Sequence, residues 1–389
     1  MIKSLCDLFI FAGEPSGDLH GSSVLKVLKE KAPQLKVEGV FGPKMRSQVN
    51  HSIIHTEEFH VMGFSDVLKA LPRLKKHFKT ILKHILTTNP KVVLLIDYPG
   101  FNLRLARSLR ENGYKGKLIH YICPSVWAWK KNRIKSMEKT LDLLLCIFPF
   151  EPKYFEKSSL KAIYVGNPSL EAISSAYYDD SWKRSLNIPK SHSIISLFPG
   201  SREGEITKNL PVQLESALKL KQEYPDTTIC ISVANENTSS LILSYLKEKN
   251  ISPLLIPERY NFDLMKNSRV AIAKCGTVTL ELALNKTPTV VTYQLSKLNA
   301  FFAKYIFQIK LPFYCIVNIL LNKQVFPELI YKDFTQHNTY LKAKDLFLDG
   351  PLREQCLSDC NQLIQCLDNS SHPSHNVADT ILKTRGSLF

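Results

Sequence analysis

The feature that most constrains the fold is a strand, loop and helix in the middle of the chain. Residues 194–197 form a short apolar run, Ile-Ile-Ser-Leu, which a Phe-Pro-Gly sequence ends. Apolar residues then recur at helical spacing over 210–218. The loop at 198–206 therefore joins the carboxyl end of a buried strand to the start of a helix, which is where open α/β sheets bind ligands.

The residues of this loop suit an anion. A helix N-terminus offers unpaired N–H groups to a phosphate, and Gly200 lets the backbone approach a ligand closely. Arg202, next to Ser201, can bind a phosphate through two parallel hydrogen bonds. The same residues also fit an ordinary turn in which Arg202 pairs with Glu203 or Glu205. The loop alone leaves both interpretations open.

Strand and helix patterns alternate along the whole chain and predict an α/β fold. The first unit is a strand at 8–12, the loop Gly-Glu-Pro-Ser-Gly-Asp at 13–18, and a helix from about Leu19. The loop lacks the G-x-G-x-x-G spacing, and no Gly-Lys-Ser/Thr follows, so NAD and ATP sites of those kinds are disfavoured. Further strands are expected at 37–41, 91–96, 118–122, 143–148, 229–233, 254–256, 270–273 and 289–291.

A chain of 389 residues is too long for one typical core, so two domains are expected. The sequence becomes richer in polar residues over 169–192, which predicts a linker between the domains. The expected parts are an N-terminal Rossmann-like domain at 1–168, a linker at 169–192, a C-terminal Rossmann-like domain at 193–340 and C-terminal helices at 341–389.

The chain carries 51 Lys and Arg against 35 Asp and Glu, a formal charge of +16. Phosphorylated substrates, an anionic membrane and nucleic acid could each match this charge. Nucleic acid is disfavoured because the sequence has no basic ribbon interleaved with aromatic residues. The nine cysteines form no CxxC pair, which disfavours a metal site and fits reduced thiols in the cytoplasm. No apolar run reaches the ~18 residues of a membrane span.

Part of the charge lies on a helix-like stretch at 66–87 with one apolar stripe. Such a basic amphipathic segment suits a membrane interface. The pattern fits equally well a helix whose apolar side faces the core and whose basic side faces solvent. Pro72 predicts a bend or two separate helices. The expected membrane or acyl-chain contacts are Val67, Leu68, Leu71 and Leu74, with Lys69, Arg73, Lys75 and Lys76.

Two more strand ends carry polar groups. The plainest buried strand delivers Asp97 to its carboxyl end, where it either faces the ligand crevice or caps the next helix. In the second half, Gly276 and Thr277 begin a helix whose N–H groups could hold a phosphate. Glu281, one turn later, could reach ribose hydroxyls or complement the helix dipole.

Several stretches together resemble one family, the lipid-A-disaccharide synthases. The most specific are Pro-Ser-Val-Trp-Ala-Trp at 124–129 and Phe-Pro-Phe-Glu at 148–151. The others, in the family's order, are Ala-Gly-Glu-Pro-Ser-Gly-Asp at 12–18, Val-Met-Gly-Phe at 61–64, Ile-Asp-Tyr-Pro-Gly-Phe-Asn at 96–102, Pro-Gly-Ser-Arg at 199–202, Gly-Thr at 276–277, Asn318 and Val-Phe-Pro-Glu-Leu at 325–329.

The resemblance implies the GT-B fold, in which two Rossmann-like domains face each other across a cleft. It implies an inverting glycosyl transfer that needs neither a metal nor another cofactor. The donor would be UDP-2,3-diacylglucosamine and the acceptor the 6-hydroxyl of 2,3-diacylglucosamine 1-phosphate. The products would be UDP and a β-1,6-linked disaccharide. The enzyme would lie on the cytoplasmic face of the inner membrane of a Gram-negative bacterium, and it could form homo-oligomers through its C-terminal region.

The resemblance also assigns roles to residues. Asp97 is the expected base, with Asp18, Glu14 and His20 as rivals, and Arg202 is expected to neutralise the leaving diphosphate. Asn318 matches an asparagine that the family requires near the donor, and it is expected to be catalytic together with Asp97 and Arg202. The expected substrate-binding residues are Glu14, Ser16, Asp18, Gly200, Ser201, Glu205, Gly276, Thr277, Glu281 and Glu328.

The chain departs from the family pattern at two places. Asn167 stands where the family commonly has histidine, so no histidine role carries over. Lys274-Cys275 precedes the Gly-Thr pair where serine is common. This second departure changes a contact on the donor side and can add affinity for phosphate.

Overall fold

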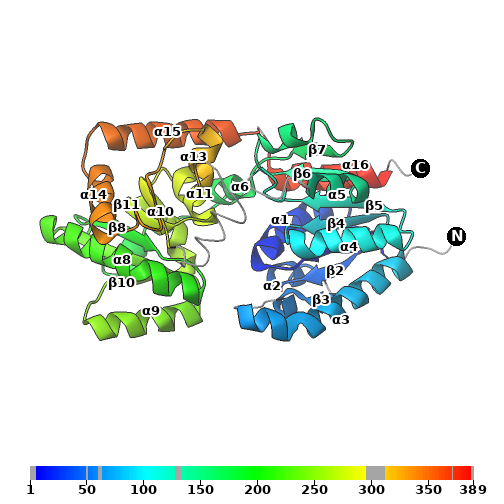
Figure 1. The fold of residues 1–389 in the computed structure, drawn as a ribbon, viewed down its shortest axis with the longest axis horizontal. Helices are drawn as coiled ribbons and strands as arrows, with labels where there is room; N and C mark the ends of the chain where they lie inside the picture. Colours follow the sequence, from blue (N-terminus) through cyan, green and yellow to red (C-terminus); the bar gives the residue numbers. More distant parts are fainter. Residues whose placement is uncertain are drawn as a thin grey trace. The chain divides into compact units, whose positions relative to one another are not determined.

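The computed structural model describes residues 6–49, 51–59, 64–127, 133–294, 312–369 and 371–386, without the side chains of 64–70. The chain divides into two compact units, each centred on a parallel sheet (Figure 1). Unit 1 comprises Met1–Pro168 and Asp368–Phe389, and unit 2 comprises Ser169–Leu367.

The sheet of unit 1 has the strand order β3-β2-β1-β4-β5-β6-β7, and every pair in it is parallel. The order reverses between β1 and β4, where Ala12 lies opposite Ile96. The strands are β1 Leu8–Ala12, β2 Val37–Phe41, β3 Ile54–His55, β4 Val92–Ile96, β5 Lys117–Tyr121, β6 Leu143–Cys146 and β7 Lys161–Tyr164.

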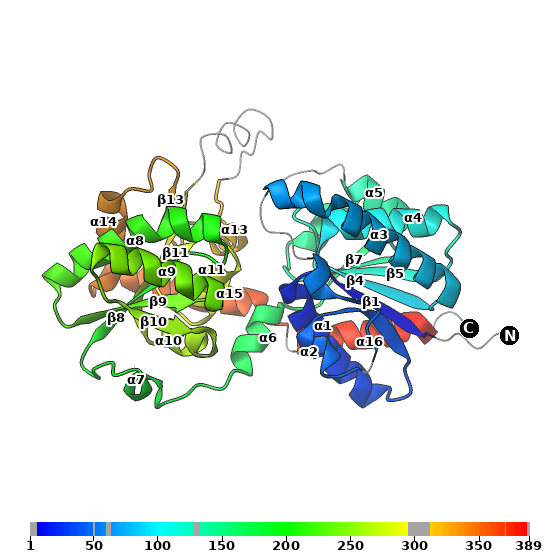
Figure 2. The same ribbon diagram turned by 90° about the horizontal axis from the view of Figure 1, so that it is seen from below.

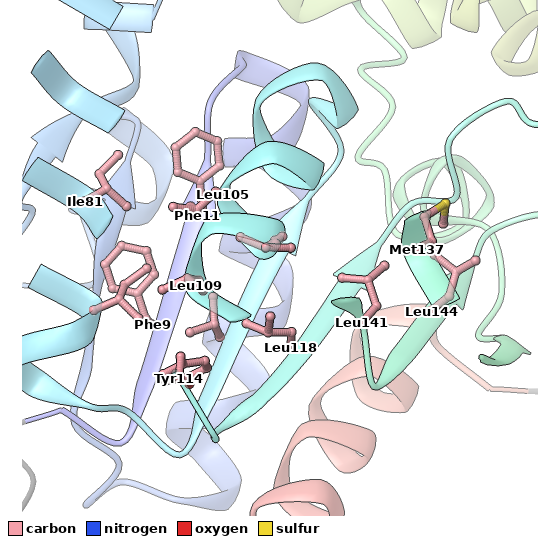
Figure 3. Close-up of a cluster of buried hydrophobic side chains, with 14 of the residues drawn as sticks. Phe9, Phe11, Ile81, Leu105, Leu109, Tyr114, Leu118, Met137, Leu141 and Leu144 are labelled. Atoms are coloured by element: carbon pink, nitrogen blue, oxygen red, sulfur yellow. The ribbon is translucent and has the colours of Figure 1, made fainter. Parts of the chain in front are cut away.

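Helices cover both faces of this sheet, which explains why β1 and β4 are apolar at every position. One face packs against α3 (Phe64–Thr88), α4 (Pro99–Glu111) and α5 (Arg133–Thr140), around the buried side chains shown in Figure 3. The other face packs against α1 (Pro15–Lys31), α2 (Pro43–Arg46) and α16 (Pro373–Gly386). Short helical segments also occur at η1 (Thr56–Phe59) and η2 (Glu151–Phe155), whereas α6 (Pro168–Ser174) belongs to unit 2 from Ser169 onward.

The last helix of the chain returns to the first unit. Val377, Ala378 and Ile381 of α16 are buried in the same core as α1, and the two helices lie side by side (Figure 2). Arg385 also donates to Asp7 over 2.8 Å. The C-terminal helices expected at 341–389 therefore belong to different units, because α14 (Gln336–Phe347) and α15 (Pro351–Leu367) lie in unit 2.

The sheet of unit 2 has the order β10-β9-β8-β11-β12-β13 and is also parallel, with its reversal between β8 and β11. The strands are β8 Ser193–Phe198, β9 Thr227–Val233, β10 Leu254–Pro257, β11 Ser268–Lys274, β12 Thr289–Tyr293 and β13 Glu328–Ile330. The helices before α14 are α7 Trp182–Ser185, α8 Glu203–Glu223, α9 Glu236–Lys249, η3 Glu258–Tyr260, α10 Asn261–Asn267, α11 Thr277–Leu284 and α13 Ile316–Leu321.

Several local expectations differ from the structure. Helix α1 begins at Pro15 and not near Leu19. Proline suits the first helical turn because backbone N–H groups there have no partner within the helix, so the N–H that proline lacks is not needed. Helix α3 is one helix that contains Pro72, so of the two alternatives, a bend or two separate helices, the second is wrong. Trp182 and Ile188 lie in the core of unit 2, so this part of the expected linker packs on that unit.

None of the helices in the described part of the chain is long and apolar enough to cross a membrane.

The return of α16 predicts which unit a core substitution weakens. Ile381→Ala should reduce the free energy of unfolding of unit 1 by about 2–5 kcal/mol, because it leaves a cavity in a fully buried site. Leu363→Ala, in a fully buried site of α15, should weaken unit 2 instead. Hydrogen exchange would show faster exchange in β1 and β4 for the first variant and in β8 and β11 for the second. Faster exchange of β8 and β11 in Ile381→Ala would contradict the assignment of α16.

Candidate functional site

Each sheet changes its strand order where candidate site residues lie. In unit 2 the reversal falls between β8 and β11, and the Gly200 loop and Gly276 follow these two strands. In unit 1 it falls between β1 and β4, which Glu14 and Asp97 follow. Loops at such a reversal diverge to opposite sides of the sheet and leave a crevice at the carboxyl edge. Both predicted sites therefore lie where their own sheets favour ligand binding.

In unit 2 this edge holds a pocket of about 410 Å³. The expected donor-side residues that line it are Gly200, Ser201, Arg202, Glu205, Gly276, Thr277 and Glu281. The structure thus brings together two loops that are about 75 residues apart in the chain. Sequence reasoning missed Ser232 and Asn261, which also line the pocket and share a 2.7 Å hydrogen bond. They follow no recognisable motif, and only the packing of β9 against α10 places them there.

An ion pair lies inside this pocket. Lys274 Nζ donates to Glu205 Oε1 over 2.9 Å, and the two side chains are only 17% and 20% exposed. Glu205 also accepts a hydrogen bond from the Ser201 N–H over 3.2 Å and lies 3.8 Å from the Arg202 guanidinium. Burial alone would raise the pKa of the Glu205 carboxyl, but the hydrogen bond and charge of Lys274, with the Ser201 N–H and the charge of Arg202, together outweigh burial and lower the pKa.

Gly200 has the backbone conformation that glycine favours, with φ +122°. A Cβ at this position would lie 2.6 Å from Glu205 Oε2, so the missing side chain makes room for the carboxylate. Glu281, on α11, also lines the pocket, and its pKa is raised by desolvation. A desolvated carboxyl group is stabilised when it accepts hydrogen bonds from the hydroxyl groups of a ligand.

Asn318 and Glu328 form a network that does not line this pocket. The Asn318 side chain is fully buried and donates to Phe326 O and Glu328 Oε1, both over 2.8 Å. Its oxygen accepts from the N–H groups of Val325 and Phe326, both over 2.9 Å. Glu328 in turn accepts from the N–H groups of Tyr314 and Cys315, just before α13. All four hydrogen-bonding positions of the Asn318 amide are therefore used within the unit.

At the carboxyl edge of the unit 1 sheet, Asp97 is an acid with a raised pKa. Burial, followed by the charge of Glu14, raises the pKa of Asp97 to about 6, and the Tyr98 N–H opposes this shift. Asp97 and Tyr98 both have positive φ, 47° and 45°, and Asn102 Nδ2 donates to the Asp97 carbonyl oxygen over 2.6 Å. The backbone that carries the carboxylate is thus held in an uncommon conformation by a buried amide.

The other acid of the first loop has a different environment. Asp18 is 2% exposed and accepts hydrogen bonds from the N–H groups of Gly42, Lys44 and Met45 over 2.9–3.0 Å. Its carboxylate therefore caps α2, which argues against the expected contact with a substrate and against a role as base. Ser16 is exposed in the first turn of α1. His20 has a pKa lowered to about 4 by burial, so it is neutral at pH 7.

Comparison with known proteins places the chain. A profile described as lipid-A-disaccharide synthetase matches residues 8–382, almost the whole chain. The chain belongs to this family. It is 34% identical over 326 residues to the lipid-A-disaccharide synthase of Geobacter sulfurreducens, which covers 84% of each protein. It is 40% identical over 379 residues to that of Chlamydia trachomatis serovar D, which covers 97% of this chain and 62% of the relative. The chain thus spans less than two thirds of the chlamydial protein.

Solved structures support the fold of this family member. The Staphylococcus aureus MnaA–UDP structure matches with a TM-score of 0.62 and 13% identity, over 99% of this chain and 98% of the other. The UDP-GlcNAc 2-epimerase of Methanocaldococcus jannaschii, in complex with UDP-GlcNAc and UDP, matches with a TM-score of 0.62 and 12% identity, over 97% and 99%. The two parallel α/β units are those of a GT-B fold, as the sequence predicted.

In this synthase-family chain the basic helix α3 divides along its length. Leu74 and Phe78 pack against the core of unit 1, and Ile81 and Ile85 are fully buried in it. Leu71, by contrast, is 41% exposed, and Lys75 and Lys76 are exposed beside it. The side chains of Val67, Leu68 and Lys69 lie outside the described residues. The later turns of α3 thus form the core-facing helix that was the alternative interpretation.

The structure also brings together three residues with side chains that can bind metal, a cluster that the sequence did not predict. Its members come from the ends of neighbouring strands. The ligand atoms of Cys123, Cys146 and Glu151 lie within 4.8 Å of one another, and all three residues are buried. Burial raises the pKa of Glu151 to about 8, and a hydrogen bond with Cys146, then burial, raises the pKa of Cys123. Glu151 accepts hydrogen bonds from the N–H groups of Ile147 and Phe148 over 3.1 Å, so its carboxyl anchors the turn after β6.

Proposed function

We propose that this chain is a lipid-A-disaccharide synthase. It transfers the sugar of UDP-2,3-diacylglucosamine to the 6-hydroxyl of 2,3-diacylglucosamine 1-phosphate and releases UDP. Membership in the family supports the reaction class. The observation that carries the donor assignment is the pocket of unit 2, where the Gly200 loop, a helix start and two cationic side chains meet at the reversal of the sheet.

In the proposed reaction the acceptor oxygen attacks the anomeric carbon of the donor sugar. The bond from that carbon to the diphosphate breaks, and UDP leaves with the electron pair. Arg202, which is 77% exposed and lines the pocket, stabilises the negative charge that develops on the diphosphate. The N–H groups at the start of α8 and α11 add to this stabilisation. Glu281 accepts hydrogen bonds from the ribose.

Asp97 is the proposed base that takes the proton of the acceptor hydroxyl. Its raised pKa, about 6, lies close to neutral pH, where a base is both deprotonated and able to hold the transferred proton. Glu14, whose charge contributes to this shift, is the proposed neighbour that keeps the proton affinity of Asp97 high. A change at Glu14 would therefore act on catalysis through Asp97.

Asn318 is proposed to act by positioning. Its amide holds Glu328 and the backbone at 325–326, and Glu328 holds the backbone ahead of α13. The pair would set the approach of this segment to the donor without touching it. The sequence predicts Asn318 as a catalytic residue near the donor, and this proposal gives it an indirect role.

One experiment tests the reaction. Purified protein with UDP-2,3-diacylglucosamine, 2,3-diacylglucosamine 1-phosphate and EDTA should form a disaccharide monophosphate, which mass spectrometry detects, together with an equal amount of UDP. UDP without disaccharide would keep the donor and overturn the acceptor. No product under conditions in which a Geobacter sulfurreducens control enzyme works, with and without added Mg²⁺, would overturn the proposal.

Asp97→Asn should lower kcat by about 10²–10⁴-fold, because the amide cannot take a proton, while UDP binding remains. The wild-type rate should depend on pH in one direction. A base works when deprotonated, so kcat/KM should fall as the pH drops through about 6 and level off above it. Steady-state kinetics from pH 5 to 8 give both results. Unchanged turnover in Asp97→Asn would remove this residue as the base.

The first turns of α3 are the proposed contact with the cytoplasmic face of an anionic inner membrane. Leu71 presents an exposed apolar side chain there, and Lys75 and Lys76 offer charge to lipid phosphates. The proposal is confined to this end because the later apolar residues of the helix lie in the core.

Lys75→Glu with Lys76→Glu should release the protein from vesicles that contain anionic lipid, because each basic residue near such a surface contributes about 1 kcal/mol. Co-sedimentation measures the bound fraction. The matched control is Lys247→Glu with Lys249→Glu on α9 of unit 2, which makes the same change of charge at exposed positions. Equal retention of both double variants would contradict the contact.

A further inference from the structure

The cationic groups of the donor pocket are already engaged by a carboxylate of the chain itself. Glu205 contacts Lys274 Nζ through one oxygen, over 2.9 Å, and the Ser201 N–H through the other, over 3.2 Å. The Arg202 guanidinium lies 3.8 Å from it. An ammonium, a backbone N–H and a guanidinium around one anion are the groups that a phosphate would also need.

These groups come from different parts of unit 2. Ser201 and Arg202 follow β8, Glu205 lies in the first turn of α8, and Lys274 ends β11. The meeting of an ammonium and a carboxylate therefore occurs at the reversal of the strand order, where the ligand is expected. A partly buried ammonium without a partner would be costly, so the Glu205 carboxylate compensates the charge of Lys274 and orients its side chain.

We propose that Glu205 is an internal stand-in for a phosphate of the donor and that Lys274 is the second cation that binds the diphosphate. The diphosphate displaces the Glu205 carboxylate from Lys274 and Ser201 when UDP-sugar enters. This inference rests on the proposed function, since it takes the pocket to be the UDP-sugar site. It reverses the expectation that Glu205 contacts the substrate, because a carboxylate at this place repels the diphosphate.

Displacement moves only a side chain near the start of a helix. Glu205 lies in the first turn of α8 and is 20% exposed, and no atom of the surrounding structure lies within 4 Å of where a Cβ on the neighbouring Gly204 would be. The lysine still has a partner when the ion pair breaks, because Lys274 Nζ lies 5.2 Å from the centre of the Tyr293 ring. It also lies 3.7 Å from where a Cβ on Gly276 would be. The ammonium therefore stays at the start of α11, beside the incoming phosphate.

The two partners of one ion pair should then change UDP affinity in opposite directions. Glu205→Gln keeps the size and the hydrogen-bonding oxygen but removes the charge, so UDP should bind about fivefold more tightly or better. Lys274→Met should weaken UDP binding about tenfold or more, and Lys208→Met, an exposed change on α8, should leave it unaltered. Isothermal titration calorimetry of the full chain at low salt measures the dissociation constants.

The ligand series separates a phosphate contact from a general effect on the pocket. Both changes should be large for UDP, smaller for UMP and absent for uridine. Weaker UDP binding by Glu205→Gln, or equal effects on uridine and UDP, would overturn the inference while leaving the proposed function in place. If the wild-type protein binds no UDP, the proposed function fails and the inference fails with it. Glu205→Gln alone decides the sign if Lys274→Met does not fold.

Discussion

Burial of two parallel sheets on both faces is the constraint on which the rest of the structure depends. Because β1, β4 and β8 are covered by helices on each side, their side chains are almost all apolar, and polar chemistry is confined to the loops at their ends. The reversal of strand order then selects one position on each edge. Glu14 and Asp97 lie at one reversal, and the Gly200 loop and Lys274 lie at the other.

The acidic groups at these edges differ in what surrounds them, and this difference separates their roles. Asp97 has a buried setting with a like charge nearby, so its pKa is raised. Glu205 has a buried setting with an opposite charge, so its pKa is lowered. Asp18 is satisfied by three backbone N–H groups and serves α2. Carboxylates thus occupy three different settings, which correspond to the proposed base Asp97, the proposed internal anion Glu205 and the cap of α2 by Asp18.

Features that depend on local patterns could be predicted from the sequence, and features that depend on contacts between distant segments could not. Strands such as β4 and β11 were predictable because an apolar run between turn residues is a local pattern. The short β3 and β13, of two and three residues, have no such pattern and form because neighbouring strands pair with them. The seven expected donor-side residues were found together because their loops follow two adjacent strands of one sheet.

The sequence by itself determined the two α/β halves, the loops that follow the central strands and the family, because these depend on local patterns and on motifs in a given order. Only the tertiary structure decided what each polar side chain does. The hydrogen-bond partners of Asp18 are 24–27 residues away, Lys274 is 69 residues from Glu205, and α16 crosses back to unit 1. Such contacts arise from the packing of elements that are distant in the chain, and no local pattern encodes them.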